Sequence, residues 1–400
     1  MQTFNFEGNG FEYFKIWIVN ILLTIVTLGL YYPWAKVRTN RYFYANSTLE
    51  GRNFEYHATG KQLFIGYLIA MGLLIVYTLI SEFLPIVGLV LLLVFLAAVP
   101  WIIWRSLKFN MRVTSFSNVR FSFDGKLSSA YFVYMLLPIL AFLAVYALPI
   151  SAAIIVPMFS GSTNGLGVIG GVLVLALVIG AIVLAFYMFG LLKKKTAEYF
   201  INGSRYGQGQ FVTDLAVAPF VKIALKAFGL SLLMTFAYLV VVALLSFVFG
   251  LSTSLLGAFG NLQNPEVMAT LFANKMILIM LALMYLGFIL VGVAAIAYAS
   301  ARQRAYIYDN TRLDRKIAFT STIGARQLMW IMVSNLLLII ITLGLATPWV
   351  KVRIARLFLN NTEVDTRIGI HEYVTQKQNE QSSLGEQIGD AFDVEVGIGI

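Results

Sequence analysis

Residues 20–38 read NILLTIVTLGLYYPWAKVR, and residues 335–353 read NLLLIIITLGLATPWVKVR. The two stretches are identical at 13 of 19 positions with a constant offset of 315, and Arg41, Phe43 and Asn46 recur at the same offset as Arg356, Phe358 and Asn361. Agreement of this extent between two apolar segments predicts homologous units at the two ends of the chain, and therefore a pseudo-symmetric fold. Internal symmetry is common among membrane transporters, although duplication also occurs without transport.

The composition of the rest of the chain predicts an integral membrane protein. Hydrophobic residues are 59% of the 400 and charged residues 12%, with a mean hydropathy of +0.81, whereas roughly a quarter of the residues of a soluble domain are charged. A helix needs about 20 apolar residues to span a bilayer. Six central segments are long enough: 62–80, 84–104, 131–157, 165–192, 222–250 and 273–299. The run Val172–Val183 is apolar without alternation, which favours helices over the strands of a closed barrel.

The positive charge lies between these segments. A net charge of +10 is spread over the loops of one side, which is typical of orientation signals, so we expect no nucleic-acid partner. The absence of cysteine excludes disulfides, thiolate metal sites and cysteine catalysis. Residues 1–10 have no basic stretch or cleavage site before an apolar core, so no removable signal peptide is predicted.

The basic connectors between the segments resemble one another. Residues 105–125, 193–211 and 302–324 each begin with cations, continue through aromatic residues around an asparagine, and end near a phenylalanine or a glycine before the next apolar segment. Phe54–Tyr56 and Phe121–Phe123 alternate apolar and polar residues before a glycine, which predicts short strands and turns; residues 4–6 look alike. The predicted fold is an all-α polytopic membrane protein, a pseudo-symmetric helical bundle with small β-containing caps on the cytoplasmic face. The alternative is ordinary loops with chance similarity.

The two terminal segments, 14–34 and 326–349, decide the topology of the chain ends. If both are single spans, 22 of the 29 Lys and Arg residues share one face; if both turn back, 28 of 29 do. The charge count therefore favours, by a small margin, re-entrant segments with the turn in TLGL and with Pro33 and Pro348 ending the returning arm. A plain spanning helix with an interfacial Pro-Trp anchor stays the alternative. The re-entrant arrangement places the N- and C-termini in the cytoplasm.

Irregular backbone at membrane depth is tolerated where it is buried or lines a wet cavity, so these segments hold the candidate pathway. The pathway candidates are Asn20, Thr27, Gly29, Pro33, Trp34, Asn335, Thr342, Gly344, Pro348 and Trp349. A purely structural role for the two asparagines is favoured over a shared site. Candidates for anionic lipid headgroups are Lys36, Arg38, Arg41, Lys351, Arg353 and Arg356, and topogenic charge explains these equally well.

No reaction is predicted from the sequence. His57 and His371 have no partner at metal-ligand spacing. Glu55 lies beside His57, and Glu12 is expected nearby; a solvated strand edge explains this group better than acid–base chemistry does. We expect no enzyme activity, catalytic residue, cofactor or metal. Gly167 and Gly171 form a GxxxG pair, which favours helix packing within the bundle and leaves a homo-oligomer open.

Residues 371–400 differ from the preceding membrane domain, residues 1–370. The tail is polar and then acidic, with Glu386, Asp390, Asp393 and Glu395 among apolar residues. Two interpretations stay open: a segment that docks on the basic connectors or recruits a partner protein, and a disordered end.

The motif TLGLYYPWAKVR at 27–38, the Asn46-Ser47-Thr48 that follows with Phe54, and the second TLGL–PWVKVR copy at 342–353 resemble the YjgN family. The resemblance covers essentially the whole chain and implies a multi-pass protein of the bacterial inner membrane, but no reaction. Our first functional hypothesis is a channel or transporter for a small or amphipathic substrate. The alternatives are a non-transporting scaffold or accessory subunit, and a lipid-binding protein; the expected partners are membrane lipids and a membrane partner protein or second copy.

Overall fold

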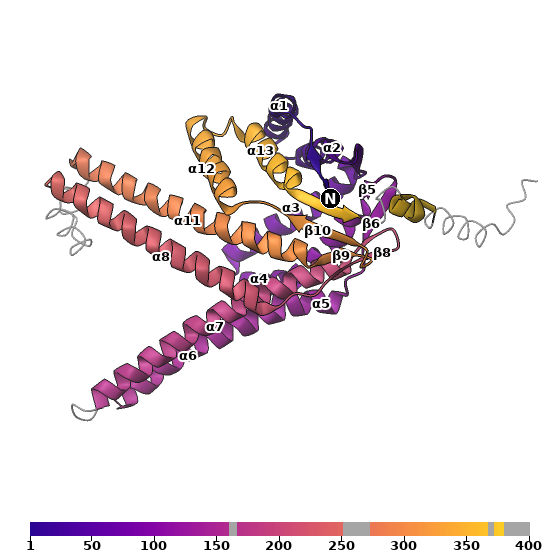
Figure 1. Ribbon diagram of the computed structural model, residues 1–400. Helices are drawn as coiled ribbons and strands as arrows, with labels where there is room; N and C mark the ends of the chain where they lie inside the picture. The colour runs from indigo at the N-terminus through magenta and orange to yellow at the C-terminus, as the bar shows by residue number, and fades with distance from the viewer. Residues whose placement is uncertain (160–165, 251–272, 367–371, 380–400) are drawn as a thin grey trace, which may run out of the picture.

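The computed structural model describes residues 1–159, 166–250, 273–366 and 372–379. Within them the chain alternates helical pairs with pairs of short strands (Figure 1). Residues 160–165 and 251–272, His371, the side chain of Gly167 and the acidic residues of the tail lie outside the described residues.

Within the described residues, six helices are long and apolar enough to cross a membrane. The long helices are α3 Gly60–Phe83, α4 Pro85–Arg112, α6 Leu137–Phe159, α7 Leu166–Gly203, α8 Val217–Val248 and α11 Lys275–Asp309, with α5 Leu127–Tyr131 and the π-helix η1 Phe132–Leu136 leading into α6. They confirm the six predicted central segments. The prediction that Arg105, Lys193 and Arg302 begin loops is wrong, because α4, α7 and α11 continue through these cations. A helix that continues into water keeps its backbone groups hydrogen-bonded while the charged side chains reach solvent.

The terminal segments form shorter helical pairs that turn back toward the strands. The pairs are α1 Gly10–Val26 with α2 Tyr32–Ala45, and α12 Ala325–Ile341 with α13 Thr347–Asn360. At 1.5 Å per residue, the 17 residues of α1 reach about 25 Å, less than the roughly 30 Å of a hydrocarbon core. Both ends of each pair therefore lie on the side of the strands, and re-entry into a membrane stays a prediction.

All the described strands belong to one antiparallel sheet, ordered β1-β11-β10-β9-β8-β7-β6-β5-β4-β3-β2. Their bounds are β1 Gln2–Thr3, β2 Asn5–Phe6, β3 Ser47–Leu49, β4 Arg52–Tyr56, β5 Thr114–Phe116, β6 Val119–Phe123, β7 Ser204–Tyr206, β8 Gly209–Thr213, β9 Thr311–Leu313, β10 Ile317–Ser321 and β11 Thr362–Thr366. Tight turns join β3–β4, β5–β6 and β7–β8 through two residues each, and all three contain a residue with positive φ, such as Gly51 or Asn118. Two-residue hairpin turns require this backbone.

The two edges of the sheet are neighbouring parts of one N-terminal segment. Strand β1 pairs with β11, strand β2 pairs with β3, and the Phe4 N–H between them donates to the Thr362 carbonyl at 3.0 Å. The sheet thus closes on itself, and we call it the β-ring. The prediction of separate small caps, and of an all-α class, is corrected here. Each connector buries its apolar strand face only by pairing with its neighbours, and a closed sheet leaves no unpaired edge.

The interior of the β-ring is the main core. Buried side chains from β3, β5, β6, β7, β9 and β11 meet there: Leu49, Phe116, Val119, Tyr206, Leu313 and Val364. Partly buried phenylalanines pack against this core: Phe4 between β1 and β2, Phe54 of β4, Phe121 of β6, Phe211 of β8 and Phe319 of β10. Alternate side chains along the strands therefore point into the ring and pack against one another there.

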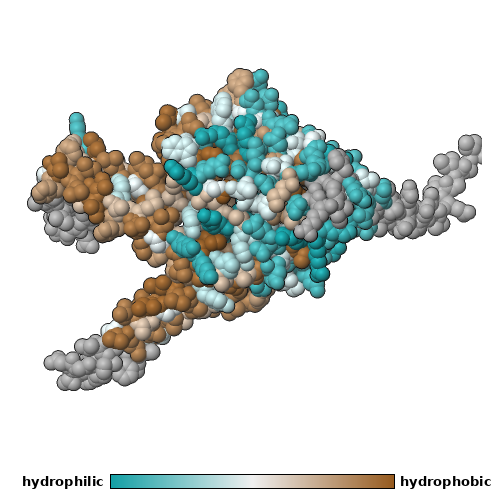
Figure 2. All heavy atoms as spheres, viewed as in Figure 1, coloured by the Kyte–Doolittle hydropathy of each residue, from teal (hydrophilic) through white to brown (hydrophobic). Residues whose placement is uncertain are grey.

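The hydropathy of the surface differs between the strands and the long helices. Hydrophilic residues gather over the β-ring and hydrophobic residues cover the projecting helices (Figure 2). Between 0% and 22% of the apolar window of each long helix is buried inside the protein. The helices therefore present their apolar surface outward, as lipid-facing helices do, and we describe the chain as a multi-pass membrane protein.

Candidate functional site

The turns of the terminal helical pairs lie where the TLGL motif predicts them. Leu28 and Gly29 have φ of 50° and 92°, and the Gly29 N–H donates to the Thr24 carbonyl at 2.7 Å. The Thr27 hydroxyl donates to the Leu23 carbonyl at 2.7 Å and accepts from the N–H of Tyr31 at 2.9 Å. This is a helix C-terminus closed by left-handed residues, where glycine avoids the steric cost of a side chain.

The second copy makes the same turn. Leu343 and Gly344 have φ of 50° and 90°, and the Gly344 N–H donates to the Ile339 carbonyl at 2.8 Å. Thr342 accepts from the N–H of Ala346 at 3.0 Å. The tip is apolar and uncovered, since 93% of Leu343 is exposed. Thr27, Gly29, Thr342 and Gly344 therefore shape turns that a membrane interior would cover.

The two prolines do not end the returning arm, as the sequence predicts; they begin it. Pro33 and Pro348 both occupy the first turn of a helix, α2 and α13. Proline fits there because the N–H that it lacks would have no partner within the helix. Both prolines are buried, so they anchor the start of the return.

The two pathway asparagines are buried but do not meet. Asn20 accepts from Arg38 Nη1 at 3.4 Å and donates to the Ala35 carbonyl at 3.3 Å, while Asn335 accepts from Arg353 Nη1 at 2.9 Å. Each asparagine thus holds together the two arms of its own helical pair. Among the described residues, no contact joins Asn20 to Asn335, so the structure does not bring the predicted pathway residues into one shared site.

Trp34 and Trp349 attach each terminal pair to its neighbour in the ring. The indole of Trp34 lies against Gly60 at the start of α3, and that of Trp349 lies against Gly10 at the start of α1; a Cβ on either glycine would overlap the ring. Close contact of this kind requires glycine. The second contact closes the circle of helical pairs between the two ends of the chain.

Most of the predicted headgroup cations have structural partners. Arg41 Nη2 donates to the Ala58 carbonyl at 3.1 Å, and Arg356 Nη2 donates to the Gly8 carbonyl at 2.9 Å. Arg38 and Arg353 hold the asparagines. Lys36 and Lys351 are exposed, and they remain the headgroup candidates of this set with no hydrogen bond or ion pair to a described residue.

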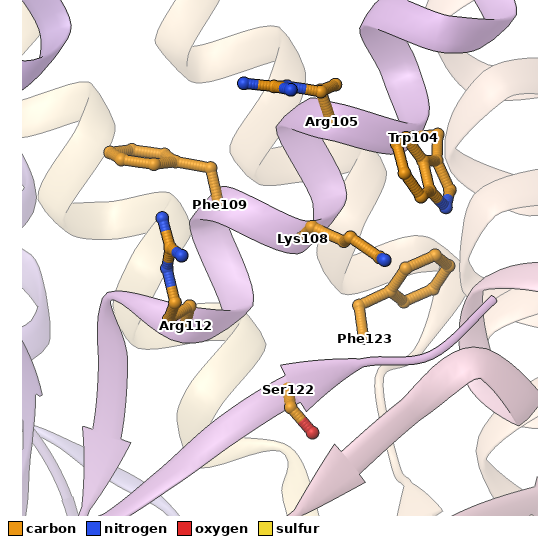
Figure 3. Close-up of a pocket in the computed structure, with 7 residues that line it drawn as sticks. All are labelled: Trp104, Arg105, Lys108, Phe109, Arg112, Ser122 and Phe123. Carbon is orange, nitrogen blue, oxygen red and sulfur yellow. The ribbon is translucent and has the colours of Figure 1, made fainter. Parts of the chain in front are cut away.

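A basic pocket of about 410 Å³ lies between the last turns of α4 and the strand β6 (Figure 3). Its lining residues are Trp104, Arg105, Lys108, Phe109, Arg112, Ser122 and Phe123. The three cations follow a spacing of three and four residues, so they share one face of α4. Three positive charges and no carboxylate line the pocket, which is the charge pattern of an anion site.

Aromatic contacts and hydrogen bonds hold the basic pocket in place. Trp104 Nε1 donates to the Gly125 carbonyl at 2.7 Å, and Lys108 Nζ lies 4.2 Å from the centre of the Trp104 ring. Asp124, which follows β6, is paired with Arg205 at 2.6 Å. That carboxylate is already neutralised by another arginine, so the pocket keeps its positive charge.

The sequence contains a signal for this pocket, which depends on how far α4 extends. The string RSLKFNMR at residues 105–112 places cations on one helical face, but only if the helix continues beyond the apolar segment. If a loop began at Arg105, the helical spacing of these cations would have no meaning.

The neighbourhood of His57 is a contact between strands. His57 Nε2 lies 2.7 Å from Ser115 Oγ and 3.4 Å from Glu55 Oε2. Both partners meet the same ring nitrogen, and Ser115 is buried. The arrangement links the end of β4 to β5 and matches the strand-edge interpretation.

Comparison with known proteins places the chain in a family. The family described as bacterial protein of unknown function, DUF898, matches residues 1–391. The inner membrane protein YjgN of Salmonella typhimurium is 28% identical over 364 residues, covering 91% of this chain and 88% of the relative. The proteins of the same name from Escherichia coli O157:H7 and K12 are 29% and 28% identical, each covering 88% of this chain and 85% of the relative.

No solved structure is significantly similar to the chain. The helices that are long enough to span, the match over nearly the whole chain and the names of the relatives agree with the YjgN resemblance. This protein is a multi-pass membrane protein that belongs to the DUF898 family, in which its curated relatives are the inner membrane proteins named YjgN.

Proposed function

We propose that this protein binds the anionic headgroups of phospholipids in the basic pocket of α4, on the side of the membrane that carries the β-ring. The observation that carries the proposal is the set of three cations, Arg105, Lys108 and Arg112, on one helical face beside Trp104 and without a lining carboxylate. Arginine pairs with phosphate through two parallel hydrogen bonds, and tryptophan favours the depth at which headgroups lie.

The proposed site suits a lipid better than a free solute. The pocket lies at the end of a helix whose preceding turns are apolar and exposed, with Trp101 and Ile102 43% and 53% exposed. A headgroup in the pocket would leave its acyl chains along that surface. Each cation near an anionic membrane surface contributes about 1 kcal/mol, so three cations support selection of anionic over zwitterionic lipid on the order of 100-fold.

The test compares lipid retention between charge variants. The full-length protein is purified in a neutral detergent, and retained phosphatidylglycerol and phosphatidylcholine are measured by native mass spectrometry. The triple variant Arg105→Gln, Lys108→Gln, Arg112→Gln should lose phosphatidylglycerol retention on the order of 100-fold. The matched control removes three exposed cations of α7 and α8, through Lys193→Gln, Lys222→Gln and Lys226→Gln, and should retain the lipid.

Two results would contradict the lipid proposal. Equal loss in both triple variants would assign retention to net charge rather than to the pocket. Displacement of the lipid by excess inorganic phosphate alone, with no preference for the intact lipid, would assign the pocket to a soluble anion.

The proposed orientation places the β-ring and both chain ends in the cytoplasm. The support is that exposed cations at the helix ends, such as Arg112 in the last turn of α4, lie next to the strands, and positive charge is retained on the cytoplasmic side. A reporter fused after Ile400 should be active only as a cytoplasmic fusion. Activity of a periplasmic reporter at that position would refute the orientation.

A second candidate function is the movement of an amphipathic substrate. The observation in its favour is that the long helical pairs diverge away from the β-ring (Figure 1), with most of their apolar surface uncovered. A substrate would then travel along these lateral faces, since aromatic side chains fill the ring itself. In proteoliposomes, a fluorescent phosphatidylglycerol analogue should cross leaflets faster with the protein than without it.

The scaffold alternative makes the opposite prediction for both assays. A non-transporting subunit would show neither pocket-dependent lipid retention nor leaflet crossing, and its exposed helices would instead be covered by a partner protein or a second copy. Copurification of a stoichiometric partner, or a dimeric mass in detergent, would favour that alternative.

A further inference from the structure

Residues 372–379 form a short helix at the end of the β-ring farthest from the membrane helices (Figure 1). Two neighbouring side chains of this helix, Tyr373 and Val374, are 4% and 2% exposed and belong to the same core as Phe116, Val119 and Tyr206. The Tyr373 ring stacks on Tyr206 with centroids 6.5 Å apart. The segment therefore covers the apolar interior of the ring.

Polar contacts fasten the segment to the hairpin turns at the rim. The Tyr373 hydroxyl donates to Asp314 Oδ2 at 2.8 Å, and Lys377 Nζ lies 3.1 Å from the same oxygen. Gln378 Nε2 donates to the Ser117 carbonyl at 2.6 Å. Asp314 and Ser117 both lie in turns with positive φ, between β9 and β10 and between β5 and β6.

The turn between β7 and β8 leaves room for the segment. A Cβ on Gly209 would overlap the Tyr373 hydroxyl, and one on Gly207 would lie 3.8 Å from Lys377 Cβ. The helix thus docks against three neighbouring hairpins. The glycines at the β7–β8 hairpin face the helix, and the β5–β6 and β9–β10 turns supply its hydrogen-bond acceptors.

The length of the segment limits how firmly it is held. A helix in water needs about 12 to 15 residues to be marginally stable alone, and this one has eight. It is therefore helical only while docked. Its buried side chains are few, and the strands beneath it are already paired around the whole ring.

We propose that residues 372–379 are a detachable plug, which exchanges between a docked state that seals the β-ring and a released state that exposes a helix-docking surface. The surface consists of Val119, Tyr206 and Gly209 with the rim acceptors Asp314 and Ser117. It fits a short helix with an aromatic and an aliphatic residue side by side and a lysine one turn later. The plug is independent of the lipid pocket on α4.

The absence of cysteine from the chain allows a direct test by single-cysteine labelling of the full-length protein in detergent. Three variants are compared for their rate of reaction with a maleimide. Val374→Cys reports on the plug, and Glu372→Cys is the exposed reference. Ala297→Cys is the reference for global unfolding, because Ala297 is 0% exposed in a core between α11 and α12. A detachable plug predicts that Val374→Cys reacts at least 10-fold slower than Glu372→Cys and at least 10-fold faster than Ala297→Cys.

The rim contact supplies the second arm of the test. Adding Asp314→Asn to each variant removes the charge that holds Tyr373 and Lys377, so labelling of Val374→Cys should accelerate about 10-fold while labelling of Ala297→Cys stays unchanged. Labelling of Val374→Cys as fast as Glu372→Cys would show that nothing is docked. Labelling as slow as Ala297→Cys, with no response to Asp314→Asn, would show a permanent part of the core and would also overturn the proposal.

Discussion

The β-ring and the long helices are stabilised by different surroundings. The ring buries Val119 completely and Val364 to 2% exposure, whereas the apolar windows of α3 and α8 have no buried residue. One region has a protein core of its own, and the other has apolar faces that only lipid or another chain covers. The difference shows that the largest buried core of this protein lies in the β-ring, and that the long helices project from the ring with most of their apolar surface uncovered.

The test with the largest expected effect replaces one phenylalanine in each region. Phe116→Ala removes a ring side chain that is 5% exposed and should destabilise the protein by about 3–5 kcal/mol, because it leaves a cavity in a packed core. Phe247→Ala on α8, which is 76% exposed, should change the stability in detergent by less than about 0.5 kcal/mol. Thermal unfolding followed by circular dichroism measures both; equal losses would break the comparison.

A second test addresses the junction between the two regions. Gly60→Ala places a Cβ against the Trp34 indole, and overpacking of this kind costs about 1–3 kcal/mol. Gly66→Ala, six residues later in α3, meets nothing within 4 Å and should stabilise the helix by about 0.5–1 kcal/mol. Opposite shifts in the melting temperature of the two variants are the expected outcome. A loss of stability from Gly66→Ala would mean that α3 packs more tightly than described.

A third test sharpens the comparison between the two terminal helical pairs. Arg353 donates to Asn335 and to Ser334 at 2.9 Å each, while Arg38 reaches Asn20 at 3.4 Å. Arg353→Gln should therefore cost about 1–3 kcal/mol and Arg38→Gln less than about 1 kcal/mol, since a buried acceptor loses its charged donor. Denaturation midpoints of the two variants, measured side by side, check the order. The reverse order would show that the second pair does not depend on its shorter hydrogen bonds.

The smallest expected effect is a pH dependence at the rim of the ring. Burial raises the pKa of Asp314, but hydrogen bonds from the Gln210 N–H, Tyr373 and Lys377 outweigh it and hold the pKa below its usual value of 3.8. A lowered pKa in the folded state adds stability above pH 3.8, and this stability is lost as the pH falls through the folded value. The labelling rate of Val374→Cys, divided by that of the exposed reference Glu372→Cys to cancel protonation of the thiol, should rise below pH 3.8, and the ratio should not respond in the Asp314→Asn variant. A response of equal size in that variant would assign the effect to other groups.

Much of the membrane architecture was predictable from local patterns. Apolar length predicted the six long helices, and the alternation in Phe54–Tyr56 and Phe121–Phe123 predicted strands in β4 and β6. The turn after Thr27 was predictable because a glycine with the right neighbours specifies a left-handed helix end. The charge count gave the same answer by a separate route, since only turning segments keep 28 of 29 cations together.

The candidate site was less predictable, because side-chain partners are not local. Trp34, Arg41 and Asn20 were candidates for a pathway or for lipid, and the structure gives each a partner in a neighbouring segment. Arg105, Lys108 and Arg112 were missed because their helical spacing counts only if α4 continues past its apolar part. Residues of the same type thus differ in role according to what lies opposite them.

The sequence by itself determined the class of the protein, its family, the long helices and the turns of the terminal pairs. These follow from hydropathy and backbone geometry within about 20 residues. The tertiary structure alone decided that the strands form one ring, that Gly10 receives Trp349, and that residues 372–379 cover the ring interior. The physical reason is distance along the chain: Gln2 pairs with Val364, and no local pattern specifies which distant strand satisfies an open edge.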